Sequence, residues 1–89
     1  MEKGKEYSFG ELKFEGEYLN GERNGKGKEY SFGKLIFEGE YLNRKRNRKG
    51  KAYYYNGEIE FEGEYLDGKR WNGKGFNKLY MKLKMVMEK

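Results

Sequence analysis

The fold of this chain is decided by residues 14–28, which read FEGEYLNGERNGKGK. The same stretch returns at residues 37–51 as FEGEYLNRKRNRKGK and at residues 61–76 as FEGEYLDGKRWNGKGF. The phenylalanines that open these stretches are 23 and 24 residues apart. A fixed period of this length is typical of repeat proteins, in which each unit buries its apolar face against its neighbours. We therefore expect an array of small, nearly identical units.

A second segment recurs between these stretches. GKEYSFG occupies residues 4–10 and 27–33, and AYYYNG at 52–57 takes its place in the next unit. The additional residue of the longer period falls in this last segment, where a loop tolerates an insertion at small entropic cost. The predicted array covers residues 1–76 and is followed by a tail. Its parts are a half repeat 1–13, repeats 14–36 and 37–60, a partial repeat 61–76 and a non-repeat tail 77–89.

Each unit has the pattern of a β-hairpin. In FEGEY, aromatic residues and glycine alternate with glutamates, so Phe14, Gly16 and Tyr18 share one face of a strand while the two glutamates share the other. The turn LNGERNG follows, rich in Asn and Gly, which accept positive φ at little cost. The second strand, KGKEYSF, alternates again. No stretch between residues 4 and 76 has the 3.6-residue apolar period of a helix, so the predicted fold class is all-β.

Glycines inside the strands predict how the sheet packs. Glycine weakens a strand unless it makes room for something else. Because these glycines lie between aromatic residues of the same face, we expect neighbouring rings to lie flat across the bare backbone. The glycines concerned are Gly16, Gly39 and Gly63 in the first strand of each unit, and Gly27, Gly50 and Gly75 in the second.

Two hairpin registers remain open at this point. In one, the glutamates of FEGEY face Lys26 and Lys28 across the ladder, and each such pair contributes a few tenths to about 1 kcal/mol. In the other, shifted by one residue, Phe14 would face Tyr30.

Composition limits the function classes. With 89 residues the chain forms one small domain at most, and its aromatic residues must supply most of the core. It has no histidine and no cysteine, so a histidine base, a cysteine nucleophile and a metal site built from these residues are excluded. The paired glutamates, such as Glu15 and Glu17, recur at alternate positions of every unit, which is typical of a solvated strand face. We expect no catalytic residue, no cofactor and no metal.

The repeats resemble the membrane occupation and recognition nexus (MORN) repeat over roughly residues 4–76. Its pattern is aromatic-x-Gly-x-aromatic, two residues, Gly, a short basic turn and Gly-x-Gly. The first copy matches this pattern at Phe14, Gly16, Tyr18, Gly21, Gly25 and Gly27. The third copy has Trp71 inserted and matches at Phe61, Gly63, Tyr65, Gly68, Gly73 and Gly75. The middle copy has two arginines in place of glycines and keeps Phe37, Gly39, Tyr41 and Gly50.

The resemblance implies an elongated, twisted, single-layer antiparallel sheet of consecutive hairpins. It also implies a non-catalytic scaffold for protein–protein interaction, with anionic-lipid binding proposed for some family members. A fold of this kind does not fix the partner. We expect a fragment or short member of a MORN array. Two alternatives stay open: a peripheral binder of anionic lipid, such as phosphoinositide, or of nucleic acid through residues 44–51, and a truncated gene product without independent function.

Four aromatic residues are candidate contacts for a partner: Tyr18, Tyr41, Tyr65 and Trp71. The tyrosines are also, with the phenylalanines, the main apolar material available for a core. Trp71 interrupts the turn of the last copy. It either contacts a partner, as exposed tryptophans often do, or folds over the end of the sheet as a cap.

The basic stretch 43–51 is the candidate anion-binding site. It contributes +6 to a net charge of +5, so the rest of the chain sums to −1, which argues against a general nucleic-acid-binding surface. Two of its arginines replace glycines where positive φ is expected, and each costs about 1 kcal/mol or more. Either this stretch contacts phosphate or it has drifted in sequence. The candidate residues are Arg44, Lys45, Arg46, Arg48, Lys49 and Lys51.

The expected partner is a protein, with an anionic membrane surface as the alternative. Neither end carries an apolar run long enough for a signal peptide or a membrane span, so we expect a cytoplasmic location, free or peripheral to a membrane. Open sheet edges and an exposed aromatic face would also allow self-association. The tail after Gly75 has no glycine and is expected to be a strand or a short helix that covers the last sheet edge.

Overall fold

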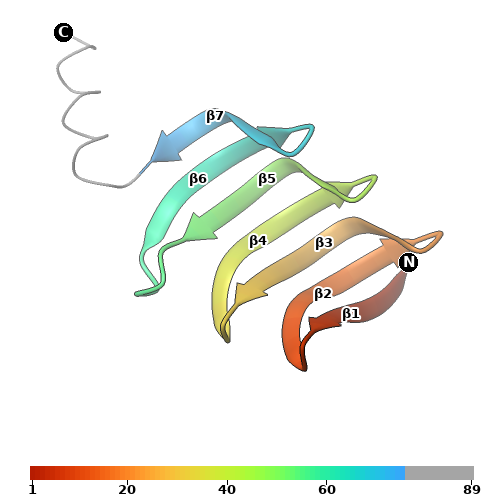
Figure 1. Cartoon of the computed structure of the whole chain (residues 1–89). Coiled ribbons are helices and arrows are strands. Elements are labelled where there is room, and N and C mark those ends of the chain that lie inside the picture. Colours follow the sequence, from red (N-terminus) through yellow and green to blue (C-terminus); the bar gives the residue numbers. More distant parts are fainter. Residues whose placement is uncertain (76–89) are drawn as a thin grey trace, which may run out of the picture.

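The computed structural model describes residues 1–75, which form one antiparallel sheet of seven strands. Each strand pairs with its neighbours along the chain, so the sheet is an open meander in a single layer (Figure 1). This confirms the all-β array of consecutive hairpins. The predicted structure of the tail lies outside the described residues. The strands are β1 (Glu2–Ser8), β2 (Glu11–Leu19), β3 (Glu22–Ser31), β4 (Lys34–Leu42), β5 (Lys45–Tyr53), β6 (Ile59–Leu66) and β7 (Lys69–Gly75).

A row of glycines crosses the sheet from one end to the other. Each glycine of the row lies opposite a glycine of the next strand, so bare backbone meets bare backbone at every pairing. On β3, for example, Gly27 has Gly16 on one side and Gly39 on the other. The row consists of Gly4, Gly16, Gly27, Gly39, Gly50, Gly63 and Gly73.

The last hairpin departs from the repeat. The repeat pattern predicts Gly75 in the glycine row, but Gly73 takes that place, opposite Gly63. The inserted Trp71 explains the difference, because it has no partner on β6 and the register shifts around it. Side chains alternate with a period of two, so a slip of two residues brings another glycine into the row without turning the strand over.

The hairpin register brings opposite charges together. Glu15 lies opposite Lys28 and Phe14 lies opposite Glu29, so the register that would set Phe14 against Tyr30 is wrong. Lys26 is not paired with Glu17 in the ladder, because the register shifts between Gly16 and Tyr18; the Lys26 amide donates to the Glu17 carboxylate instead. The charged face carries two rows in which lysines of odd-numbered strands alternate with glutamates of even-numbered strands. One row is Lys5, Glu15, Lys28, Glu38, Lys51 and Glu62; the other is Lys3, Glu17, Lys26, Glu40, Lys49 and Glu64.

The core lies on the opposite face of the sheet and is almost entirely aromatic, as the composition predicts. Phe14 and Phe37 are fully buried, and neighbouring rings meet edge to face with centroids 5.1–5.7 Å apart. Such pairs contribute about 0.5–1.5 kcal/mol beyond the burial of their area. Rings also cover the glycines: a Cβ on Gly27 would lie 2.5 Å from the Phe14 ring. Among the described residues, the buried hydrophobic side chains are Phe14, Phe37, Tyr41, Ala52, Phe61 and Tyr65.

Candidate interaction surfaces

Glu6, Tyr18 and Arg23 form a cluster that links the first three strands. Arg23 donates hydrogen bonds of 2.8 and 2.9 Å to the Glu6 carboxylate, and the Tyr18 hydroxyl donates another of 2.6 Å. The Arg23 guanidinium also lies 4.1 Å from the centre of the Phe14 ring. The hydrogen bond from Arg23 holds the pKa of Glu6 below its usual value, although partial burial acts in the opposite direction. This first Glu–Tyr–Arg cluster therefore pairs polar groups beside the core.

Glu29, Tyr41 and Arg46 form the second Glu–Tyr–Arg cluster, on β3, β4 and β5. Arg46 Nε donates to Glu29 at 2.8 Å, the Tyr41 hydroxyl donates to the same carboxylate, and the guanidinium lies 4.1 Å from the centre of the Phe37 ring. Burial by itself would raise the pKa of Glu29, but the hydrogen bonds from Arg46 and Tyr41 outweigh it and the pKa is lowered. Arg46, a predicted anion ligand, is thus engaged in the sheet itself.

The third copy of this cluster lacks its acid. Ala52 stands where the earlier copies have glutamate, and it is buried. The Tyr65 hydroxyl is consequently buried with no hydrogen-bond partner in the described part of the chain. Arg70 donates instead to Glu60, at 2.5 Å. A buried donor without a partner costs about 1–3 kcal/mol, so this copy is the weakest of the three.

The remaining basic residues of the stretch 44–51 do not converge on one patch. Lys49 lies opposite Glu64 in the charged row. The other four form ion pairs with neighbouring segments: Arg44 with Glu22 at 3.3 Å, Lys45 with Asp67 at 3.0 Å, Arg48 with Glu40 at 3.9 Å and Lys51 with Glu62 at 3.7 Å. Carboxylates of the sheet thus offset much of this positive charge, which weakens its field at the surface. Anion binding by these residues stays a prediction.

The two charged rows line a groove of about 1330 Å³ that runs across β1 to β6. Its floor is the backbone of the glycine row. The lining contains six lysines and six glutamates, so the groove is neutral overall. It therefore lacks the single-sign field that concentrates phosphates in a basic groove.

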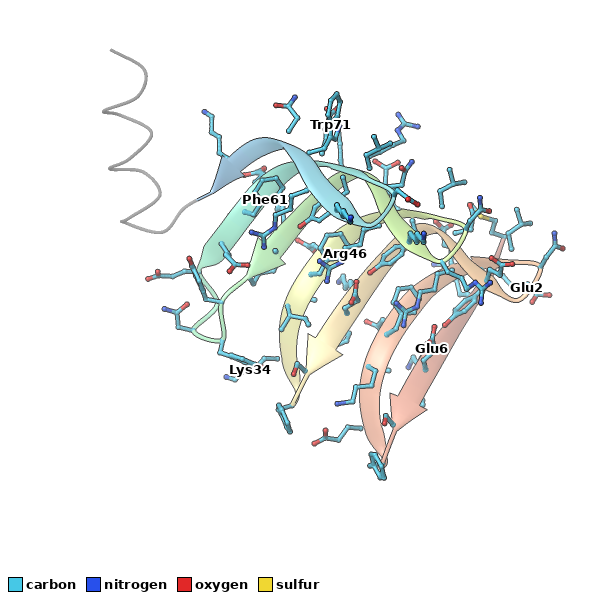
Figure 2. The ribbon with its side chains drawn as sticks, turned by 45° about the horizontal axis from the view of Figure 1, so that its top comes forward. Glu2, Glu6, Lys34, Arg46, Phe61 and Trp71 are labelled. Carbon is cyan, nitrogen blue, oxygen red and sulfur yellow. The ribbon has the colours of Figure 1, made fainter. Side chains whose placement is uncertain are left out.

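The predicted aromatic contacts have different surroundings. Tyr41 and Tyr65 lie in the core, 4% and 2% exposed, and cannot meet a partner in this arrangement, because the sheet covers its aromatic face with its own rings. Tyr18 is half-buried, with its hydroxyl bonded to Glu6. Trp71 is 64% exposed and projects from β7 (Figure 2), so it is not folded down over the sheet, and its contact with a partner stays a prediction.

A row of exposed aromatic residues, absent from the sequence-based prediction, lies in the hairpin turns at one end of the strands. Phe9, Phe32 and Tyr55 occupy the β1–β2, β3–β4 and β5–β6 connections, which all lie at that end (Figure 1), and are 103%, 74% and 58% exposed. We call them the aromatic turn row. Phe9 and Phe32 have φ of 51° and 49°, which bulky residues rarely adopt. The sequence could have indicated this row. At the equivalent position of the turns at the other end of the strands, it has residues that commonly adopt the left-handed conformation, Asn20, Asn43 and Asp67, whereas Phe9 and Phe32 do not belong to that type.

Two further features bear on function. Residues 1–75 contain no helix with the length and apolar character that a membrane-spanning helix needs. Within the same residues, no three His, Cys, Asp or Glu side chains converge as a metal site would require.

Comparison with known proteins identifies the family. No curated protein and no protein of known structure matches the chain. The sequence pattern of the MORN repeat matches it at residues 14–32, 37–59 and 61–75, which is more than half of its length. Each match begins within an even-numbered strand and runs through the odd-numbered strand that follows it. The chain belongs to the MORN repeat family.

Proposed function

We propose that this chain is a non-catalytic scaffold that binds another protein through the aromatic turn row. The observation that carries the proposal is the exposure of Phe9 and Phe32 in left-handed turns. A side chain in that conformation costs about 1–2 kcal/mol, and in these turns the exposed rings gain little from burial. The cost is offset if the rings are buried in a contact.

The geometry of the row suits a protein surface. Successive rings are two strands apart, about 9–10 Å, so the row spans about 20 Å. Each aromatic side chain can bury about 150–250 Å². Three rings in line therefore supply a compact apolar centre of the kind that dominates binding energy in protein interfaces.

The test is affinity capture by the full chain, compared with a Phe9→Asn/Phe32→Asn/Tyr55→Asn variant. Asparagine suits the left-handed conformation of Phe9 and Phe32, and Tyr55 is exposed and loses only one exposed hydrogen bond, to Ser31, so the variant is expected to stay folded. A protein captured by the wild type and lost by the folded variant supports the proposal. Equal capture by both proteins contradicts it, because the rings would then make no contribution.

Anionic-lipid binding through residues 44–51 is a second candidate, favoured by one observation. Arg44 and Arg48 have φ of 72° and 66°, and their side chains are 74% and 75% exposed. Each basic residue near an anionic membrane contributes about 1 kcal/mol. Co-sedimentation with phosphatidylserine vesicles should then weaken with salt and fall in an Arg44→Gly/Arg48→Gly variant. No binding at low salt would exclude this function.

A further inference from the structure

β1, β3 and β5 have nearly the same sequence but different surroundings. β3 lies between β2 and β4, and β5 lies between β4 and β6. β1 has only β2 beside it within residues 1–75, and it forms one end of the sheet (Figure 1). Equivalent residues on the three strands therefore show what β1 lacks on its outer side.

The first difference is an aromatic ring. A Cβ on Gly27 would lie 2.5 Å from Phe14 of the preceding strand and 3.0 Å from Tyr41 of the following one. At Gly4 the three nearest atoms all belong to Tyr18, the counterpart of Tyr41. Gly4 thus has no counterpart of Phe14 among the described residues.

The burial of neighbouring residues reflects this missing ring. Gly50 repeats the two-ring arrangement, with Phe37 and Tyr65 at 2.6 and 3.1 Å from a Cβ placed there. Gly27 and Gly50 are buried, whereas Gly4 is only half-buried. Tyr18 is half-buried too, although Tyr65 is 2% exposed.

The second difference is a hydrogen-bond acceptor for a tyrosine. Tyr30 on β3 donates to Glu15 of the preceding strand at 2.8 Å, and Tyr53 on β5 donates to Glu38 at 2.6 Å. Tyr7 is the equivalent residue of β1 and is 61% exposed. A glutamate at the corresponding place on an added outer strand would accept a hydrogen bond from the Tyr7 hydroxyl.

The third difference is charge. Lys28 lies between two glutamates, with Glu15 opposite it on β2 and Glu38 opposite it on β4. Lys5, its counterpart on β1, has a glutamate opposite it on one side only among residues 1–75, namely Glu15. An outer strand would therefore meet a lysine, and a glutamate at that position would continue the alternation of charge.

We propose that the outer edge of β1 is a docking site for an extended strand of the type aromatic–Glu–Gly–Glu from another protein. Its aromatic ring would lie over Gly4 against Tyr18, its first glutamate would meet Lys5 and Tyr7, and its glycine would extend the glycine row. The backbone groups of β1 that face outward would form the ladder, as in other cases of strand addition. This edge is separate from the aromatic turn row, so it would give the chain a second contact with a partner.

A second copy of this chain fits the site less well. β1 carries Lys3 and Lys5 on the charged face, and β7, the other outermost strand of the described part, carries Lys74. Pairing two such strands would set lysine against lysine, which is destabilising. The edge therefore matches an acidic strand from a different chain, such as an array whose outermost strand has the sequence of β2.

The test uses the full chain and a fluorescent peptide that copies β2, ELKFEGEYL. The control peptide is ELKFKGKYL, in which both glutamates are lysine. Fluorescence anisotropy at low ionic strength should show the glutamate peptide binding at least tenfold more tightly than the lysine peptide. A Lys3→Glu/Lys5→Glu variant should reverse this preference, and Tyr7→Phe should weaken binding of the glutamate peptide a few-fold. Circular dichroism checks that both variants are folded.

Hydrogen exchange locates the bound peptide. Protection of residues 2–8 on binding supports the proposal, whereas protection confined to β7 or to the hairpin turns overturns it. Equal affinity for the two peptides, or no binding of either, also overturns it. So does a dimer of the chain alone that occupies this edge and resists the peptide.

The peptide assay is separable from the proposed function of the turns. The Phe9→Asn/Phe32→Asn/Tyr55→Asn variant keeps every residue named for the β1 edge, so it should bind the peptide as the wild type does. Peptide binding without protein capture would reject the aromatic turn row alone, and protein capture without peptide binding would reject the β1 edge alone.

Discussion

Ala52 interrupts a pattern that the earlier copies maintain. Glu29 lies between Phe14 and Phe37 on the neighbouring strands, and Ala52 lies between Phe37 and Phe61, so the two positions have similar surroundings. We expect Ala52→Glu to raise the free energy of unfolding by about 1–3 kcal/mol, because the Tyr65 hydroxyl and Arg70 would gain a buried acceptor. Urea denaturation measures the change in the free energy of unfolding. The dependence of that free energy on urea concentration (the m-value) should be the same in both proteins.

Glu29→Ala is the matched control for this prediction. It creates in the middle copy the defect that the third copy already has, leaving Arg46 and the Tyr41 hydroxyl without their acceptor. Its expected cost is about 2–3 kcal/mol. If Ala52→Glu lowered stability as much as Glu29→Ala does, the two sites would not be equivalent and the unpaired Tyr65 hydroxyl would need another explanation.

Phe32 tests the conformational cost of the aromatic turn row. Its φ of 49° matches the 53° of Asn20, which occupies the same place in a turn at the other end of the strands. Phe32→Asn should therefore raise the free energy of unfolding by about 1 kcal/mol, since asparagine tolerates this conformation. The reverse exchange, Asn20→Phe, should lower it by a similar amount in the same denaturation experiment. Loss of stability in Phe32→Asn would mean that the ring stabilises the isolated chain.

At the scale of elements, each intact Glu–Tyr–Arg cluster joins three consecutive strands. Glu29, Tyr41 and Arg46 come from β3, β4 and β5, so the cluster ties one hairpin to the next. The backbone adds a second tie: the Arg44 amide donates to the Arg23 carbonyl at 3.0 Å, and the Gly68 amide donates to the Arg46 carbonyl at 2.9 Å. In a sheet whose strands pair only with their neighbours, such links to the next strand but one make the hairpins cooperative.

The clusters predict how stability responds to acid. The folded-state pKa values of Glu6 and Glu29 are lowered from 4.5, so the ionised carboxylates favour the folded state. This contribution is fully present above pH 4.5 and is lost as the pH falls through the lowered values. Urea denaturation between pH 7 and pH 3 should show the decline, and it should be shallower in Glu29→Gln. If the free energy of unfolding of the variant fell as steeply with pH as that of the wild type, Glu29 would not be a cause of the acid sensitivity.

Part of the hairpin could be predicted from the sequence and part could not. The alternation of FEGEY and the Asn–Gly turns specify strands, faces and hairpins locally, and the glycines between aromatics predict the covering rings. The Glu–Tyr–Arg clusters join residues up to 17 positions apart on three strands, which local alternation does not show. A comparison of Glu6, Glu29 and Ala52 among the copies would have marked that position. The register of β7 was missed because the slip around Trp71 depends on which of two glycines enters the row.

At the scale of the whole molecule, the alternation of charge determines the charge that each outermost strand carries. Odd-numbered strands carry lysines on the charged face and even-numbered strands carry glutamates. Of the seven described strands, the first and the last, β1 and β7, therefore carry lysine. Two copies that pair their β1 edges antiparallel, with Gly4 opposite Gly4, would set Lys3 of each copy against Lys5 of the other. The self-association expected from open edges is thus opposed by charge.

This reasoning predicts an unusual dependence of self-association on two substitutions. Lys3→Glu alone makes the paired edges complementary, since each Glu side chain would meet Lys5 of the other copy, and dimerisation should tighten at least tenfold. The double variant Lys3→Glu/Lys5→Glu sets glutamate against glutamate and should return to the wild-type level. Sedimentation at low ionic strength measures both, and added salt should weaken the single variant's dimer because exposed charges are screened. If the double variant dimerised as strongly as the single one, dimerisation through the β1 edge would depend on the loss of lysine and not on charge complementarity.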